Sequence, residues 1–178
     1  MNGATTGSRA DARAPFLRGL KAVVARIDRL SFITIAVAFG LMATLVSVQV
    51  FMRYVLSSSI DSAAELSRLF FVWTIFLALP QGISRGVHVG IDALINVMPG
   101  WLKHWCWRLT TLLSLVLMLA LSWLSIGAIG DKWQELMPTL DVTAAVYYIP
   151  VLICSIHASL HLLLMLLEDS RVETPEAP

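Results

Sequence analysis

The chain has 178 residues, of which 57% are hydrophobic and only 14% are charged, and its formal net charge is +1. A soluble domain of this size cannot bury so much apolar surface, so we expect a protein that lies in lipid. The small net charge is unlike that of a nucleic-acid-binding surface. Cys106 and Cys154 fit neither a disulfide framework nor a paired-thiol metal site, and we interpret both as packing residues.

Four apolar runs predict an all-α integral membrane protein with four transmembrane helices. We place these spans at about 30–52, 62–84, 109–130 and 142–167. The second charge-free run is only 16 residues long, from Leu69 to Ser84, whereas a helix needs about 20 residues to cross a bilayer. The sequence Ser62-Ala63-Ala64-Glu65 has the form of a capping box and extends this span backwards. The extended helix would carry Glu65 and Arg68 one turn apart, where they can pair.

The basic residues predict the orientation of these spans, because cytoplasmic segments carry the excess of Lys and Arg. Ten of the thirteen lie in the N-terminal segment, the loop between the second and third spans and the C-terminal segment. The other three are Arg53, Arg68 and Lys132. We therefore expect a basic cytoplasmic N-terminal tail at 1–26, a membrane domain at 27–167 and a cytoplasmic C-terminal tail at 168–178. The composition of both tails is typical of disorder.

Several residues within the spans carry expectations of their own. Pro80 and Pro150 lie inside the second and fourth spans, where each removes a backbone donor and should bend the helix. Trp73 and Trp123 fall deep in the membrane, so we expect their indole N–H groups to face other helices, where a partner is available.

His157 and His161 are four residues apart and share one face of the fourth span, an arrangement that could bind haem or a metal. A haem held between helices would need a histidine in another span, whereas His88 and His104 lie in the loop. A polar packing role or an interfacial position is the alternative. A haem- or quinone-associated anchor subunit of a redox complex remains the second hypothesis for the whole chain.

We find no serine nucleophile, paired carboxylates or phosphate-binding loop, so the sequence predicts neither an enzyme nor a bound cofactor. Mid-membrane carboxylates and paired broken helices, which mark ion and substrate pathways, are missing as well. The remaining polar residues gather near the first two spans and in the loop that follows them: Arg53, Tyr54, Glu65, Arg68 and Trp73, then Arg85, Gly86, His88 and Asp92.

These residues lie in strings that carry a family resemblance. Arg53-Tyr54-Val55-Leu56, the segment from Glu65 to Trp73 and the segment from Arg85 to Asp92 resemble the small-permease subunit of tripartite ATP-independent periplasmic (TRAP) transporters. The segment from Pro138 to Pro150, with Tyr147 and Tyr148, is similar to the start of that family's fourth helix. The resemblance covers roughly residues 30–165.

The resemblance implies a multi-pass protein of the bacterial inner membrane that transports nothing alone. It would scaffold a large permease subunit that carries the sodium and substrate sites, while a periplasmic binding protein delivers an organic acid. Arg53, Glu65 and Arg68 would then contact the large permease or the binding protein, or form an internal salt-bridge cluster between the first two helices. For Arg85, His88 and Asp92, the alternative to a functional contact is a solvated cytoplasmic turn.

Overall fold

The computed structural model describes residues 6–58, 60–84 and 99–168, with side chains from Arg18 onward except at 84, 100, 101, 103 and 168. The helices are α1 (Thr6–Val55), α2 (Asp61–Ser84), α4 (Gly100–Asp131) and α5 (Ile149–Glu168). A short 3-10 helix, η1 (Ala144–Tyr147), precedes α5. In these described ranges, β-structure is limited to an isolated bridge between Leu136 and Thr143.

Four helical stretches are long and apolar enough to cross a membrane, which confirms the predicted fold class. They are Arg18–Val55, Asp61–Ile83, His104–Asp131 and Ala144–Leu167. The first helix continues back to Thr6, so the expectation of disorder in the N-terminal tail is wrong for residues 6–26. The C-terminal residues 169–178 and the loop residues Arg85, Gly86, His88 and Asp92 lie outside the described residues.

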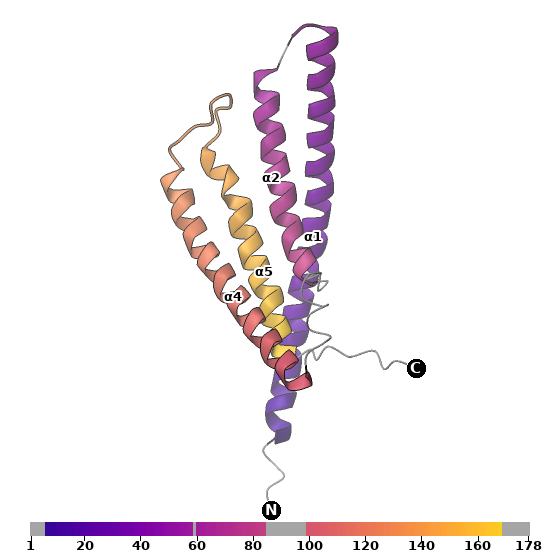
Figure 1. Cartoon of the computed structure of the whole chain (residues 1–178), viewed down its shortest axis with the longest axis vertical. Helices are drawn as coiled ribbons and strands as arrows, with labels where there is room; N and C mark the ends of the chain where they lie inside the picture. The colour runs from indigo at the N-terminus through magenta and orange to yellow at the C-terminus, as the bar shows by residue number, and fades with distance from the viewer. Residues whose placement is uncertain (1–5, 59, 85–98, 169–178) are drawn as a thin grey trace, which may run out of the picture.

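The helices follow the order α1, α2, α5, α4 across a layer that is spread out at one end and converges at the other, where α5 also meets α1 (Figure 1). The packed neighbours are α1 with α2, α2 with α5, and α5 with α4, while α1 also touches α5 over a shorter length. Within the most apolar 18-residue stretch of each span, 50% of the residues are buried in α5 but only 6% in α4. Helix α5 is therefore the centre of the layer, and α1 and α4 form its edges.

Small side chains make up part of the buried face of α5, beside His157, His161, Leu162 and Leu164. Cys154, Ser155, Ala158 and Ser159 are all buried, and Ala63 of α2 is buried as well. In membranes, where lipid tails are as apolar as the side chains, small residues favour helix association because they let the backbones approach closely. The sequence of α5 thus explains why this helix has neighbours on both sides.

The two prolines occupy different positions in their helices. Pro80 lies inside α2, and both proline side chains are fully buried. Pro150 is the second residue of α5, where the backbone N–H of any residue would lack an intrahelical partner. Pro150 therefore begins a helix and need not bend one, whereas the bend at Pro80 stays a prediction.

The turn after α1 contains the one non-glycine residue with positive φ in the described parts of the chain, Ser57 at 49°. The N–H groups of Leu56 and Ser58 both donate to the carbonyl of Met52, at 3.1 and 3.2 Å. The left-handed conformation costs a residue with a Cβ about 1–2 kcal/mol. The turn therefore stores a small strain.

We expect Ser57→Gly to raise the free energy of unfolding by up to about 1 kcal/mol, because relief of this strain exceeds the added entropy of the unfolded chain. The neighbouring change Ser58→Gly is the matched control and should lower stability by about 0.5 kcal/mol. Thermal unfolding of the detergent-purified chain measures both. Equal effects at the two positions would contradict the strain at Ser57.

Candidate functional site

Helix α2 is fastened to the connection between α4 and α5 by three residues, which we call the loop clasp: Glu65, Thr139 and Tyr147. The Glu65 carboxylate accepts hydrogen bonds from the Thr139 N–H, at 2.9 Å, and from the Thr139 hydroxyl. The Tyr147 hydroxyl donates to the Glu65 carbonyl at 3.3 Å. The clasp therefore joins residues that are 74 and 82 positions apart.

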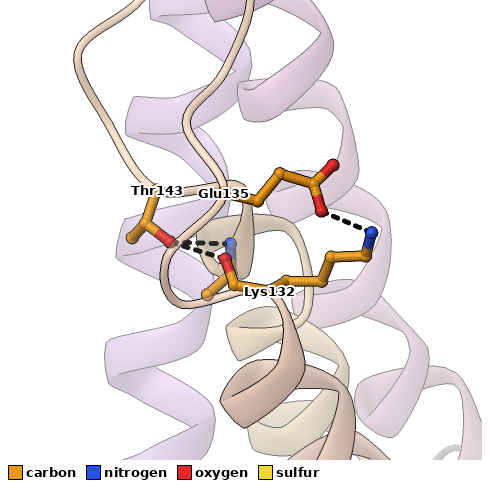
Figure 2. Close-up of polar contacts among 4 residues, drawn as sticks. Lys132, Glu135 and Thr143 are labelled. Carbon is orange, nitrogen blue, oxygen red and sulfur yellow. Dashed lines mark hydrogen bonds and ion pairs between the residues drawn. The ribbon is translucent and has the colours of Figure 1, made fainter.

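The segment that presents Thr139 has its own hydrogen bonds. The Thr143 hydroxyl donates to the Lys132 carbonyl at 3.0 Å and accepts from the Ala145 N–H at 3.2 Å, which caps η1 (Figure 2). The Ala144 N–H donates to the Glu135 carbonyl at 2.7 Å. These bonds close the segment into a compact loop, so Thr139 is positioned by a folded structure.

Lys132 and Glu135 form an ion pair on the surface of this loop (Figure 2). The hydrogen bond and charge of Glu135 raise the pKa of Lys132 above its usual value. A raised lysine pKa means that any stabilisation is present at neutral pH and is lost as the pH rises through that pKa. Both side chains are exposed, so the pair contributes little to stability.

The two deep tryptophans differ from each other. The Trp73 indole N–H donates to the carbonyl of Val146 in η1 at 3.2 Å, which confirms its expected internal partner. Trp123 on α4 is 79% exposed, so the expectation that it faces another helix is wrong. Trp73 thus adds a second link between α2 and η1.

The other polar residues predicted near the first two spans are not part of the loop clasp. Tyr54 is 79% exposed, and Arg53 and Arg68 are exposed as well. No ion pair joins Arg53, Glu65 and Arg68, whose side chains the structure describes. The predicted capping box is wrong, because α2 begins at Asp61 and the Glu65 carboxylate is bonded to Thr139. The sequence could not reveal Thr139 as a partner so far along the chain.

A second polar group, the histidine cluster, joins α1 to α5 and consists of Asp28, His157 and His161. Asp28 Oδ1 lies 2.9 Å from His157 Nε2 and 3.0 Å from His161 Nε2. The two imidazole rings are 4.9 Å apart between centroids. The Gln81 side-chain amide of α2 donates to the Asp28 carbonyl at 3.3 Å. Three helices therefore meet at Asp28.

Asp28 was not predicted as a partner of the two histidines, because only a second histidine in another span was considered. Asp28 lies just before the charge-free run that begins at Leu30, and His161 lies near the opposite end of the fourth span. The first and fourth spans cross the membrane in opposite directions, so these residues lie at similar depth. A search for any metal-binding or hydrogen-bonding side chain at that depth would have found the carboxylate.

Most hydroxyl groups within the spans are bonded to their own helix. Each donates to the carbonyl four residues earlier, a common arrangement for Ser and Thr within helices: Thr34, Thr44, Ser47, Ser67, Thr74, Thr111, Ser122, Ser125, Ser155 and Ser159. In the described part of the chain, these hydroxyls therefore do not link the helices or mark a polar path between them.

Comparison with known proteins gives consistent similarities. Residues 29–172 match the family model described as tripartite ATP-independent periplasmic transporters, DctQ component. The chain is 30% identical over 107 residues to the C4-dicarboxylate TRAP transporter small permease protein DctQ of Vibrio cholerae, a match covering 60% of this chain and 44% of the relative. It is 35% identical over 60 residues to the "Putative TRAP transporter small permease protein" of Haemophilus influenzae, covering 34% and 37%. Each alignment spans less than half of the relative's length.

Proposed function

We propose that this chain, which belongs to the DctQ component family of TRAP transporters, scaffolds and anchors the large permease subunit. The transporter that the two subunits form would be coupled to sodium and would carry organic acids. A DctQ component is a non-catalytic part of its transporter. In this proposal the large permease carries the ion and substrate sites. The chain lies in the bacterial inner membrane with both termini in the cytoplasm, as the excess of basic residues on that side favours.

The observation that carries this proposal is the single layer of helices. A transport path needs polar groups around an enclosed route through the membrane. Most described span hydroxyls are bonded within their own helices, and the helices follow one another across a layer and do not enclose a central route (Figure 1). The architecture therefore suits a scaffold that supports another membrane subunit.

The edges of the layer offer surface for such a subunit. Large apolar side chains are more than half exposed along α1, such as Phe39 and Phe51, and along α4, such as Leu113, Leu117 and Leu124. Extended exposed apolar surfaces mark contacts with protein or membrane. The large permease would cover part of these edges, and membrane lipid would cover the rest.

The end of the layer that carries the loop clasp is the proposed contact region for the periplasmic substrate-binding protein. Arg53 and Tyr54 at the end of α1 and Arg68 in α2 are exposed, at the same end of the molecule as the α4–α5 connection (Figure 1). Exposed aromatic and arginine side chains are frequent anchors of protein interfaces. The name of the Vibrio cholerae relative, a C4-dicarboxylate TRAP transporter small permease protein, supports a C4-dicarboxylate as the kind of organic acid delivered.

Reconstitution tests the proposal. We expect uptake of a C4-dicarboxylate, driven by an inward sodium gradient, in proteoliposomes that contain this chain, the large permease and the binding protein. Vesicles that hold this chain alone should accumulate none, and replacement of sodium by potassium should abolish uptake.

Two results would contradict the assignment. Accumulation by vesicles with this chain alone would show that the chain carries its own transport path. Full uptake by the large permease and binding protein without this chain would show that the scaffold is not required.

A further inference from the structure

The histidine cluster has the composition and spacing of a metal site. One ligand atom from each of Asp28, His157 and His161 lies within 4.8 Å of the other two. Two imidazoles and one carboxylate, with a fourth position open, are a donor set that zinc and related divalent transition metals accept. The ligands come from two helices that the layer already brings together.

His157 supplies an independent observation. Its side chain is only 2% exposed. Its Nε2 lies 2.9 Å from Asp28 Oδ1, whereas its Nδ1 has no hydrogen-bond partner among the described residues. A buried imidazole with one such nitrogen is costly, and both histidines direct Nε2 at the same carboxylate oxygen, as two ligands of one ion would.

We propose that Asp28, His157 and His161 bind one divalent transition-metal ion, with zinc as the best fit, and that the ion fastens α1 to α5. Ligand atoms around a tetrahedral zinc ion lie about 3.3 Å apart, since each bond is roughly 2.0–2.2 Å long. The separations of 2.9 and 3.0 Å from Asp28 Oδ1 need to open by a few tenths of an ångström. The two histidine nitrogens lie within 4.8 Å of each other and must come to the same spacing.

The surroundings indicate how the ion enters and how tightly it binds. The Asp28 side chain is 33% exposed, which leaves room beside it for a fourth ligand such as water. Metal binding at His157 Nε2 places the ring proton on Nδ1, for which the described residues offer no acceptor. Loss of such an outer partner weakens metal sites by about 10- to 100-fold. We therefore expect an affinity below that of a fully supported structural zinc site.

The proposal goes beyond the transport function and does not depend on it. A zinc ion at this position would stabilise the layer at the end opposite the loop clasp, where α1 meets α5. The site can therefore be tested on the purified chain, without a transport assay.

The test uses the full chain without an affinity tag, purified in detergent, treated with a chelator and then titrated with zinc. We expect one zinc ion per chain by elemental analysis and by competition with a chromogenic chelator. Because the ion binds only the folded layer, thermal unfolding should shift upward by about 5–10 °C at a zinc concentration ~100 times Kd.

Variants locate the site. Asp28→Asn and His161→Gln keep a polar side chain of similar size, and each should weaken zinc binding by more than about 100-fold. His104→Gln on α4 lies outside the cluster and should bind zinc like the original chain. Cobalt adds a readout that packing alone would not change, because its visible ligand-field absorption should appear with the original chain and vanish with either cluster variant.

Each outcome decides the proposal. Zinc bound at one equivalent and lost in both cluster variants, with helical content retained by circular dichroism, would support it. Absence of zinc binding in the original chain would overturn it, as would binding that survives Asp28→Asn and His161→Gln. A zinc-induced stability shift of equal size in His161→Gln would also count against it.

Discussion

Replacing Ala158 by leucine is expected to lower the free energy of unfolding by about 1–3 kcal/mol, the usual cost of overfilling a close-packed interior. Ala158 is 0% exposed and lies midway along α5, the helix that contacts all three others. Added methylene groups there would push α5 away from its neighbours. We also expect reduced recovery of the large permease with this variant.

The matched control for this prediction is Ala120→Leu. Ala120 is exposed on α4, so the same increase in volume should change stability by less than about 0.5 kcal/mol. Thermal unfolding of both variants in the same detergent gives the comparison. If Ala158→Leu unfolds at the temperature of the original chain, the close packing of α5 is not what holds the layer together.

Glu65→Ala is expected to release the α4–α5 connection from α2 and to weaken recovery of the large permease. The change removes the acceptor for the Thr139 N–H and hydroxyl. Hydrogen bonds to charged groups contribute roughly 1.5–3 kcal/mol each when sheltered, and partial exposure reduces this. We therefore expect a loss of about 1–2 kcal/mol in the stability of the chain.

Glu135→Ala is the matched control, because it removes another carboxylate from the same end of the molecule. Among the described residues, the Glu135 carboxylate pairs with Lys132 at the surface, so its loss should leave stability and partner recovery nearly unchanged. A double-mutant cycle between Glu65→Ala and Thr139→Val should give a coupling energy of at least about 0.5 kcal/mol. Unchanged co-purification and uptake with Glu65→Ala would contradict a role for the clasp in assembly.

Hydropathy was sufficient to predict the four spans, because a helix that crosses lipid must present an apolar surface over its whole length. Even the second span was found despite its two charges. The helical extension of α1 back to Thr6 was not predicted, because a charged segment with little apolar content is typical of disorder. Alanine and arginine, which are frequent in that segment, also favour helix formation.

For each candidate site, the sequence predicted the polar residues on one helix but not their partners on another segment. Glu65 and the two histidines stood out as polar side chains near apolar runs, but their partners Thr139 and Asp28 are 74 and more than 100 positions away. Such pairs depend on which helices become neighbours, and the order α1, α2, α5, α4 does not follow from the order along the chain. Trp123 shows the same limit, since depth in the membrane does not determine which way a side chain faces.

The hydroxyl groups that bond to their own helices bear on how this protein is built in the cell. A helix with its polar side chains already satisfied can enter the bilayer as a finished unit and diffuse there before it meets any neighbour. The contacts that require a second helix are few, and among the described residues they include Glu65 with Thr139, Trp73 with Val146, and Asp28 with the histidines. Insertion and assembly are thus separable stages, and these contacts belong to the later one.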